Sequence, residues 1–184
     1  MSVGLYKVLT ERRIKTAFMK PIGQEVVNVG DRNVDKDSYL IGSVFHMKKR
    51  YKEMNPVTIG RGYTEKYINN PHKEKLRLAI ERSFNSLAKG KEAIIVEGTG
   101  HAGVGAVIDY SNADVAKLLG SKVIIVSEGG IGKCIDEIIL NKALFDLMEV
   151  EVLGVIVNKI IPEKFDKIKD YSDADLIVCA VSSL

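Results

Sequence analysis

The stretch that decides the fold is residues 93–105, AIIVEGTGHAGVG. Four apolar residues open it, and a glycine-rich run follows from Glu97 onward. Short runs that are apolar almost throughout are typical of strands in a parallel sheet that helices cover on both faces. Because open parallel sheets bind ligands where their strands end, we expect Glu97 and the glycines after it to lie at a ligand-binding edge.

Similar apolar runs recur along the chain and predict further strands at residues 16–19, 122–126, 152–157 and 176–181. Apolar residues at three- and four-residue steps predict helices at residues 3–13, 71–90, 114–119 and 131–148. Strand and helix therefore alternate, which predicts an α/β fold with a mostly parallel, doubly wound sheet and helices on both faces. From the length of 184 residues we expect one domain over residues 1–184.

The composition excludes several classes of protein. Hydrophobic residues make up 46% and charged residues 28%, as in ordinary globular domains. The net charge of +3 is too close to neutral to favour nucleic-acid binding. No apolar run approaches the roughly 18 residues of a membrane span, so we expect a cytoplasmic protein without membrane partners. Cys134 and Cys179 are not close enough in sequence for a zinc ribbon or a disulfide scaffold.

Residues 21–69 interrupt the alternation with glycines and prolines among charged residues. This segment is predicted as a loop-rich insertion over one edge of the sheet, with a helix near residues 38–48. Long loops in α/β domains often cover a site, and plain surface excursions are equally common. Both interpretations stay open at this point.

The glycine-rich run matches a dinucleotide-binding pattern. Gly98, Gly100 and Gly103 satisfy G-x-G-x-x-G directly after a strand, which favours a nicotinamide-binding oxidoreductase as one alternative. That function requires a helix that opens at Gly103. Residues 107–112 suit a loop or turn instead, with a helix cap near Ser111 or Asn112.

Residues 127–134 and Glu97 each allow two interpretations. Residues 127–134, SEGGIGKC, resemble a Walker A loop, but Ser127 replaces its first glycine and Cys134 its last hydroxyl residue, so we interpret them as a glycine-rich loop near a nucleotide. Glu97, at the end of an apolar strand, is equally suited to hold Mg²⁺ or to begin a solvated loop.

Polar residues follow three of the predicted strands. Lys20 follows residues 16–19 and is a point charge suited to phosphate or carboxylate. Asn158, followed by Lys159, has an amide that can read an adenine edge, although both residues are common in turns. Asp31, Asp35 and Asp37 cluster after Lys20, and three such acids more often form a solvated surface than a metal site.

Taken in order, four strings resemble the dethiobiotin synthetase-like group of P-loop NTPases. They are FMKPI at 18–22, DKDS at 35–38, IVEGTG at 95–100 and GVIVNK at 154–159. This group includes dethiobiotin synthetase, the nucleotide-binding part of cobyrinic acid a,c-diamide synthase and the amino-terminal domain of some phosphotransacetylases. The resemblance covers about residues 2–161, and each string is only moderately specific.

The resemblance implies a role for each matching residue. Lys20 would be the catalytic lysine that contacts substrate and phosphate, and Asp37 and Glu97 would bind Mg²⁺. A shift in the alignment would give the role of Asp37 to Asp35. The resemblance also implies nucleotide-binding residues, namely Asn158, Lys159, Gly98 and Gly100. Thr99 and His101 would belong to a loop that lies along the substrate. An intact member would use ATP and Mg²⁺ to phosphorylate a small-molecule carboxylate or carbamate, then close a ring or form an amide. Dethiobiotin synthetase forms homodimers, so the resemblance also implies a homodimer for this chain.

The sequence also departs from the family pattern. It begins where the family's first strand and G-x-x-x-x-G-K-[ST] loop should end, so we expect that strand and the Walker A loop to be missing. An ATP-dependent ligase is therefore expected only with an intact phosphate loop upstream. The alternative is a non-catalytic sensor or regulatory domain, like the amino-terminal region of phosphotransacetylases.

Overall fold

The protein is described from a computed structural model, in which residues 1–30, 32–47, 50–130, 132–161, 163 and 178–181 are described. Contacts divide the chain into two compact units, Met1–Asn112 and Ala113–Leu184. That residues 1–184 form one domain stays a prediction. Asp31, Ile131 and the first part of the strand expected at 176–181 lie outside the described residues.

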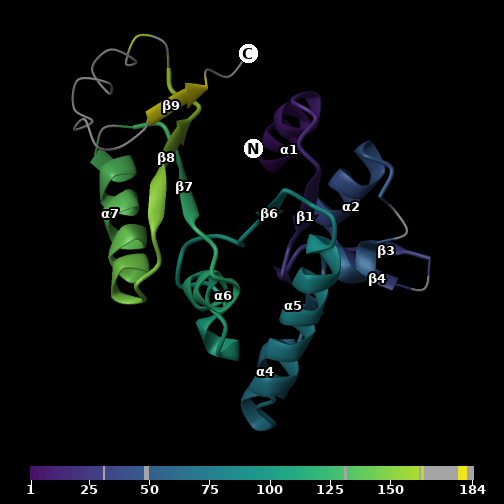
Figure 1. The fold of residues 1–184 in the computed structure, drawn as a ribbon. Helices are drawn as coiled ribbons and strands as arrows, with labels where there is room; N and C mark the ends of the chain where they lie inside the picture. The colour runs from purple at the N-terminus through teal and green to yellow at the C-terminus, as the bar shows by residue number, and fades with distance from the viewer. Residues whose placement is uncertain (31, 48–49, 131, 162, 164–177, 182–184) are drawn as a thin grey trace. The chain divides into compact units, whose positions relative to one another are not determined.

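A parallel strand pair lies at the centre of the first unit. β1 (Thr16–Met19) pairs with β6 (Ala93–Val96), and Met19 is opposite Val96. Both strands have the bounds that the apolar runs predict. β1 is buried throughout, and α1 (Ser2–Glu11) and α5 (Lys73–Ala88) contact it (Figure 1). This register brings the residues that follow the two strands side by side.

The α5 helix forms for the reason that its sequence indicates. Leu76, Ile80 and Leu87 are its buried residues, spaced four and seven apart so that they share one helix face. The same core contains the largest fully buried apolar side chains of the first unit: Phe18, Met19, Ile41, Met54, Ile80 and Ile108.

The segment 21–69 has more regular structure than the loop-rich insertion that we predicted. It contains the strands β2 (Ile22–Gly23), β3 (Val26–Val29), β4 (Arg32–Asp35) and β5 (Val57–Thr58), and the helices α2 (Lys36–Val44), α3 (Tyr51–Met54) and α4 (Tyr63–Asn69). β2 pairs with β5 in parallel, and β3 with β4 as an antiparallel hairpin. The predicted helix begins at Lys36 instead of residue 38, because Asp35 caps it.

The second unit is also α/β. α6 (Asn112–Leu119) leads into β7 (Val123–Glu128), α7 (Gly132–Leu147) and β8 (Val152–Asn158). β7, β8 and β9 (Val178–Val181) form a parallel sheet in that order. Together with the pair in the first unit, this sheet confirms the predicted α/β class with mostly parallel strands. Within the described residues, no helix has the length and apolar character to cross a bilayer.

Candidate functional site

Lys20 and Glu97 lie at the carboxyl ends of two neighbouring strands. Each directly follows its strand, and the Glu97 amide donates to the Met19 carbonyl oxygen at 2.8 Å. The Lys20 amide donates to the Met54 carbonyl oxygen at 2.7 Å. The parallel register therefore fixes both backbones at the edge where open α/β sheets bind ligands.

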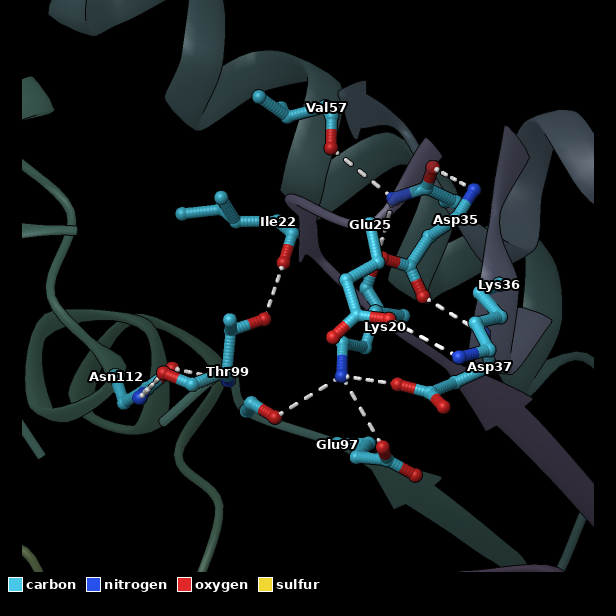
Figure 2. A network of polar contacts seen from close by, with 12 residues as sticks. Lys20, Ile22, Glu25, Asp35, Lys36, Asp37, Val57, Glu97, Thr99 and Asn112 are labelled. Atoms are coloured by element: carbon cyan, nitrogen blue, oxygen red, sulfur yellow. Dashed lines mark hydrogen bonds and ion pairs between the residues drawn. The ribbon is translucent and has the colours of Figure 1, made fainter. Parts of the chain in front are cut away.

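The Lys20 ammonium joins two carboxylates and a carbonyl group. Its Nζ donates to Asp37 Oδ2 at 2.6 Å, to Glu97 Oε1 at 3.1 Å and to the Gly98 carbonyl oxygen at 3.2 Å (Figure 2). The Lys20 side chain is 6% exposed, against 43% for Asp37 and 25% for Glu97. The lysine is thus the buried member of the cluster, and the carboxylates lie on its solvent side.

Asp35 holds the beginning of α2 and so positions Asp37. Its side chain is 1% exposed and accepts the Asp37 amide at 2.9 Å, which is an ordinary N-cap contact. Gly23 permits this arrangement, because a Cβ atom there would lie 2.7 Å from Asp35 Oδ2. The sequence left Asp37 and Asp35 as alternatives for one role. In the structure Asp37 contacts Lys20, whereas Asp35 caps the helix.

Asn55 connects the segments on which these residues lie. Its Nδ2 donates to the carbonyl oxygens of Lys20 at 2.9 Å and Val57 at 3.0 Å, and its Oδ1 accepts the Asp35 amide at 3.0 Å. The Thr58 hydroxyl donates to the same Oδ1 at 2.9 Å. Asn55 is 7% exposed, so the end of β1, the end of β4 and β5 are joined through one buried amide.

Asn112 performs a similar role for the loop after Glu97. Its side chain accepts the Thr99 amide at 3.2 Å and donates to the carbonyl oxygens of Thr99 at 2.8 Å and His101 at 2.7 Å. The Thr99 hydroxyl donates to the Ile22 carbonyl oxygen at 2.9 Å (Figure 2). The loop is therefore tied to α6 on one side and to the segment after Lys20 on the other.

The remaining loop positions are placed as follows. Gly100 has a φ of +65°, a conformation that glycine adopts without strain. His101 is exposed, and its Nδ1 accepts the Gly103 amide at 3.2 Å. Gly98 contacts Asn112, since a Cβ atom there would lie 2.8 Å from Asn112 Oδ1.

The cluster shifts the pKa values of its three ionisable groups. Burial acts to lower the pKa of Lys20, but the hydrogen bond to Asp37 and the charge of Glu97 prevail and raise it. Burial acts to raise the pKa of Asp37, yet the Lys20 hydrogen bond lowers it. Burial dominates at Glu97, whose pKa is raised although Ser2 and Lys20 act to lower it. The two carboxylates therefore shift in opposite directions, as neighbouring acids do.

The two carboxylates have the chemistry of a magnesium site. Mg²⁺ prefers oxygen ligands and is usually bound by one or two carboxylates, with waters and substrate phosphates completing its shell. Asp37, Glu97 and the Gly98 carbonyl supply oxygen ligands at one point. No group of three or more His, Cys, Asp or Glu suited to a metal occurs among the described residues. Asp37 and Glu97 would therefore hold the ion with help from water or phosphate.

Asn158 and Lys159 belong to the second unit. Asn158 ends β8, opposite Glu128 on β7 and Val181 on β9, and its carbonyl oxygen accepts the Gly129 amide at 2.6 Å. Lys159 has a φ of +58°, and its ammonium forms an ion pair with Glu128. The structure brings Lys20, Asp37, Glu97 and Gly98 together in the first unit; the nucleotide role of Asn158 stays a prediction.

The dinucleotide pattern lacks the helix that it requires. After Gly103 the chain turns into a short 3-10 helix, Ala106–Ile108, and α6 begins only at Asn112. Gly98, Gly100 and Gly103 thus lie in a loop that Asn112 fastens. This removes the structural basis for the nicotinamide-binding alternative.

Sequence reasoning missed Asn55 and the loop contacts of Asn112. Asn55 precedes Pro56 in a segment of turn-forming residues, where asparagine is common for local reasons. Asn112 was expected only as a candidate helix cap. In both cases the partners at the site lie more than ten residues away in sequence: Lys20 and Asp35 for Asn55, and Thr99 for Asn112. No local pattern marks these contacts.

Comparison with known proteins shows the family to which this chain belongs. A family model described as an AAA domain matches residues 1–184, and the chain belongs to this family. It is 27% identical to the ATP-dependent dethiobiotin synthetase of Methanococcus vannielii over 186 residues, which cover 96% of this chain and 84% of that protein.

The phosphate acetyltransferases of Pseudomonas putida and Pseudomonas aeruginosa are similar over a smaller share of their length. Each is 28% identical over 167 residues, which cover 87% of this chain but 22% of those enzymes. These findings place the chain in the dethiobiotin synthetase-like group of P-loop NTPases.

Proposed function

We propose that this chain is an ATP- and Mg²⁺-dependent domain of ligase type that phosphorylates a carboxylate or carbamate. The observation that supports it best is the Lys20 ammonium held between Asp37 and Glu97 at the end of β1 and β6. The similarity to an ATP-dependent dethiobiotin synthetase supports the use of ATP. Asn158 is proposed to read the adenine, and the loop with Thr99 and His101 to face the substrate.

In the proposed reaction a substrate carboxylate oxygen attacks the γ-phosphorus of ATP, and ADP leaves. A nitrogen nucleophile then displaces phosphate and forms an amide or closes a ring. Bound Mg²⁺ would neutralise charge on the phosphates. Lys20 would stabilise the oxygens that gain negative charge, and its fixed position at the strand edge removes the need to reorganise it during the reaction.

Calorimetric titration with ATP tests the proposal, with and without Mg²⁺. We expect Glu97→Gln to weaken binding about tenfold, or about 1.4 kcal/mol, only when Mg²⁺ is present, because it removes one carboxylate ligand. Glu11→Gln is a matched control, since Glu11 is exposed and pairs with Lys7. Absence of ATP binding by the folded chain, or equal binding by Glu97→Gln, would contradict the proposal.

A second candidate function is a non-catalytic sensor or regulatory domain. The similarity to part of two phosphate acetyltransferases favours it, because the matched region is only 22% of the length of those enzymes. This function predicts ATP binding without ADP formation in the presence of candidate carboxylates and amines. An assay of ADP release therefore separates the two functions.

A further inference from the structure

The Lys20 ammonium uses its whole hydrogen-bonding capacity on groups that also suit a divalent cation. An ammonium has three protons, and the structure gives Nζ three acceptors: Asp37 Oδ2, Glu97 Oε1 and the Gly98 carbonyl oxygen. Two carboxylates and a carbonyl oxygen are also typical ligands of hard divalent cations. Lys20 Nζ therefore lies at the position where these oxygen atoms would bind a divalent cation.

A cation at this point stabilises the two carboxylates. Asp37 Oδ2 and Glu97 Oε1 lie 2.6 and 3.1 Å from the same atom, Lys20 Nζ. Two carboxylates held around one point repel each other, and a positive charge between them offsets that repulsion. In the structure Lys20 supplies this charge from the buried side, at 6% exposure.

The Lys20 main chain is held in place, whereas its side chain is a flexible four-carbon stem. Its amide donates to the Met54 carbonyl oxygen and its carbonyl oxygen accepts from Asn55, so the main chain is fixed on both sides. The ammonium is held by the three acceptors named above. A four-carbon stem permits the ammonium to reorient without a backbone change.

We propose that Lys20 is an exchangeable counter-ion. Its ammonium holds Asp37 and Glu97 together until a divalent cation takes the two carboxylates, and it then turns to an anionic oxygen of the substrates. Two cations cannot share these carboxylates at close range without mutual repulsion, so lysine and metal compete for them. The identity of the cation as Mg²⁺ rests on the proposed function; the competition itself follows from the geometry.

Binding of Mn²⁺ alone to the full chain, measured from free Mn²⁺ by electron paramagnetic resonance, tests the competition. We expect Lys20→Met to bind Mn²⁺ about tenfold more tightly than the wild type, because the competing charge-assisted contacts are gone. Lys20→Arg keeps a positive charge and should show no gain. Lys20→Met combined with Asp37→Asn should lose the gain. A folded Lys20→Met protein that binds Mn²⁺ no better than the wild type would overturn the proposal.

A second measurement uses the unmodified protein. A lysine ammonium with three hydrogen bonds exchanges its protons slowly enough to give a ¹⁵N-coupled side-chain signal, and we expect Mg²⁺ to shift or remove that signal. A Lys20 signal that Mg²⁺ leaves unchanged would overturn the proposal, even if Lys20→Met fails to fold. Neither experiment contains nucleotide. Failure here therefore differs from failure of the ATP titration.

Discussion

Asn55 is a single residue that connects several segments of the site. It donates to the Lys20 and Val57 carbonyl oxygens and accepts the Asp35 amide and the Thr58 hydroxyl. Each of these contacts satisfies a polar group in or near the core, where an unpaired group is costly. The positions of Lys20 and of the α2 cap therefore depend on one side chain.

We expect Asn55→Ala to lower the free energy of unfolding by about 3 kcal/mol, because it leaves buried polar groups without partners. Urea denaturation measures the change. Asn28→Ala is the control, since Asn28 is exposed on β3, and it should change stability by less than about 0.5 kcal/mol. A loss at Asn55 no larger than at Asn28 would show that these hydrogen bonds do not stabilise the fold.

Lys20 and Glu97 show which site residues a sequence can reveal. Both directly follow short apolar strands, so their place at a sheet edge was predictable from pattern alone. Asp37 was chosen over Asp35 only through the resemblance to a family. Its actual position depends on the local cap made by Asp35. The Asp35 amide is in turn held by Asn55, twenty residues away, and no local pattern encodes that contact.

At the scale of elements, the loop between β6 and α6 is held by a side chain of the helix that follows it. Asn112 accepts the Thr99 amide and donates to two loop carbonyl oxygens. We expect Asn112→Ala to raise the hydrogen-exchange rate of the Thr99 amide about tenfold or more, because its acceptor is removed. Exchange followed by NMR gives this rate directly.

The control for this experiment is Lys117→Ala on the same helix. Lys117 is 53% exposed and pairs with Glu149, so its removal should leave the Thr99 amide protected. If Asn112→Ala leaves Thr99 exchange unchanged, another contact holds the loop. Thr99, whose hydroxyl donates to the Ile22 carbonyl oxygen, would then be the next residue to substitute.

Elements differ in how far the sequence predicts them, and the strength of the local apolar pattern explains part of the difference. β1 and β6 have the bounds expected from their apolar runs, because those runs end sharply at Lys20 and Glu97. β2 and β5 have two residues each and exist only through their pairing with each other. A pattern of two residues is too short to detect, so β2 and β5 were not predicted, and the only element expected within 21–69 was a helix near residues 38–48.

At the scale of the whole molecule, Tyr67 links stability to alkaline pH. It is 2% exposed, and its hydroxyl donates to Asp109 Oδ2 at 2.8 Å. Burial and the Asp109 carboxylate raise the pKa of Tyr67 to about 12. Unfolded tyrosine loses its proton near pH 10, so the folded state binds more protons between those values. Stability must therefore fall as the pH rises from about 10 to about 12.

We expect Tyr67→Phe to remove part of this alkaline loss of unfolding free energy, measured by urea denaturation at a series of pH values. The raised pKa of Lys20 contributes a loss in the same direction, which both proteins share. Tyr39→Phe is the matched control, a Tyr-to-Phe change at a side chain that is 43% exposed. Equal slopes for Tyr67→Phe and wild type would mean that Tyr67 is not the group that titrates.

The β3–β4 hairpin has one end at the site and the other end away from it. Val26 is opposite Asp35 at the end near Lys20, while Val29 is opposite Arg32 at the other end. Only the first of these pairs touches the cap that positions Asp37. Additional residues placed between Val29 and Arg32 would lengthen the ribbon away from the carboxylates. That position is accordingly suited to a fluorescent label or an epitope insertion that leaves the chemistry intact.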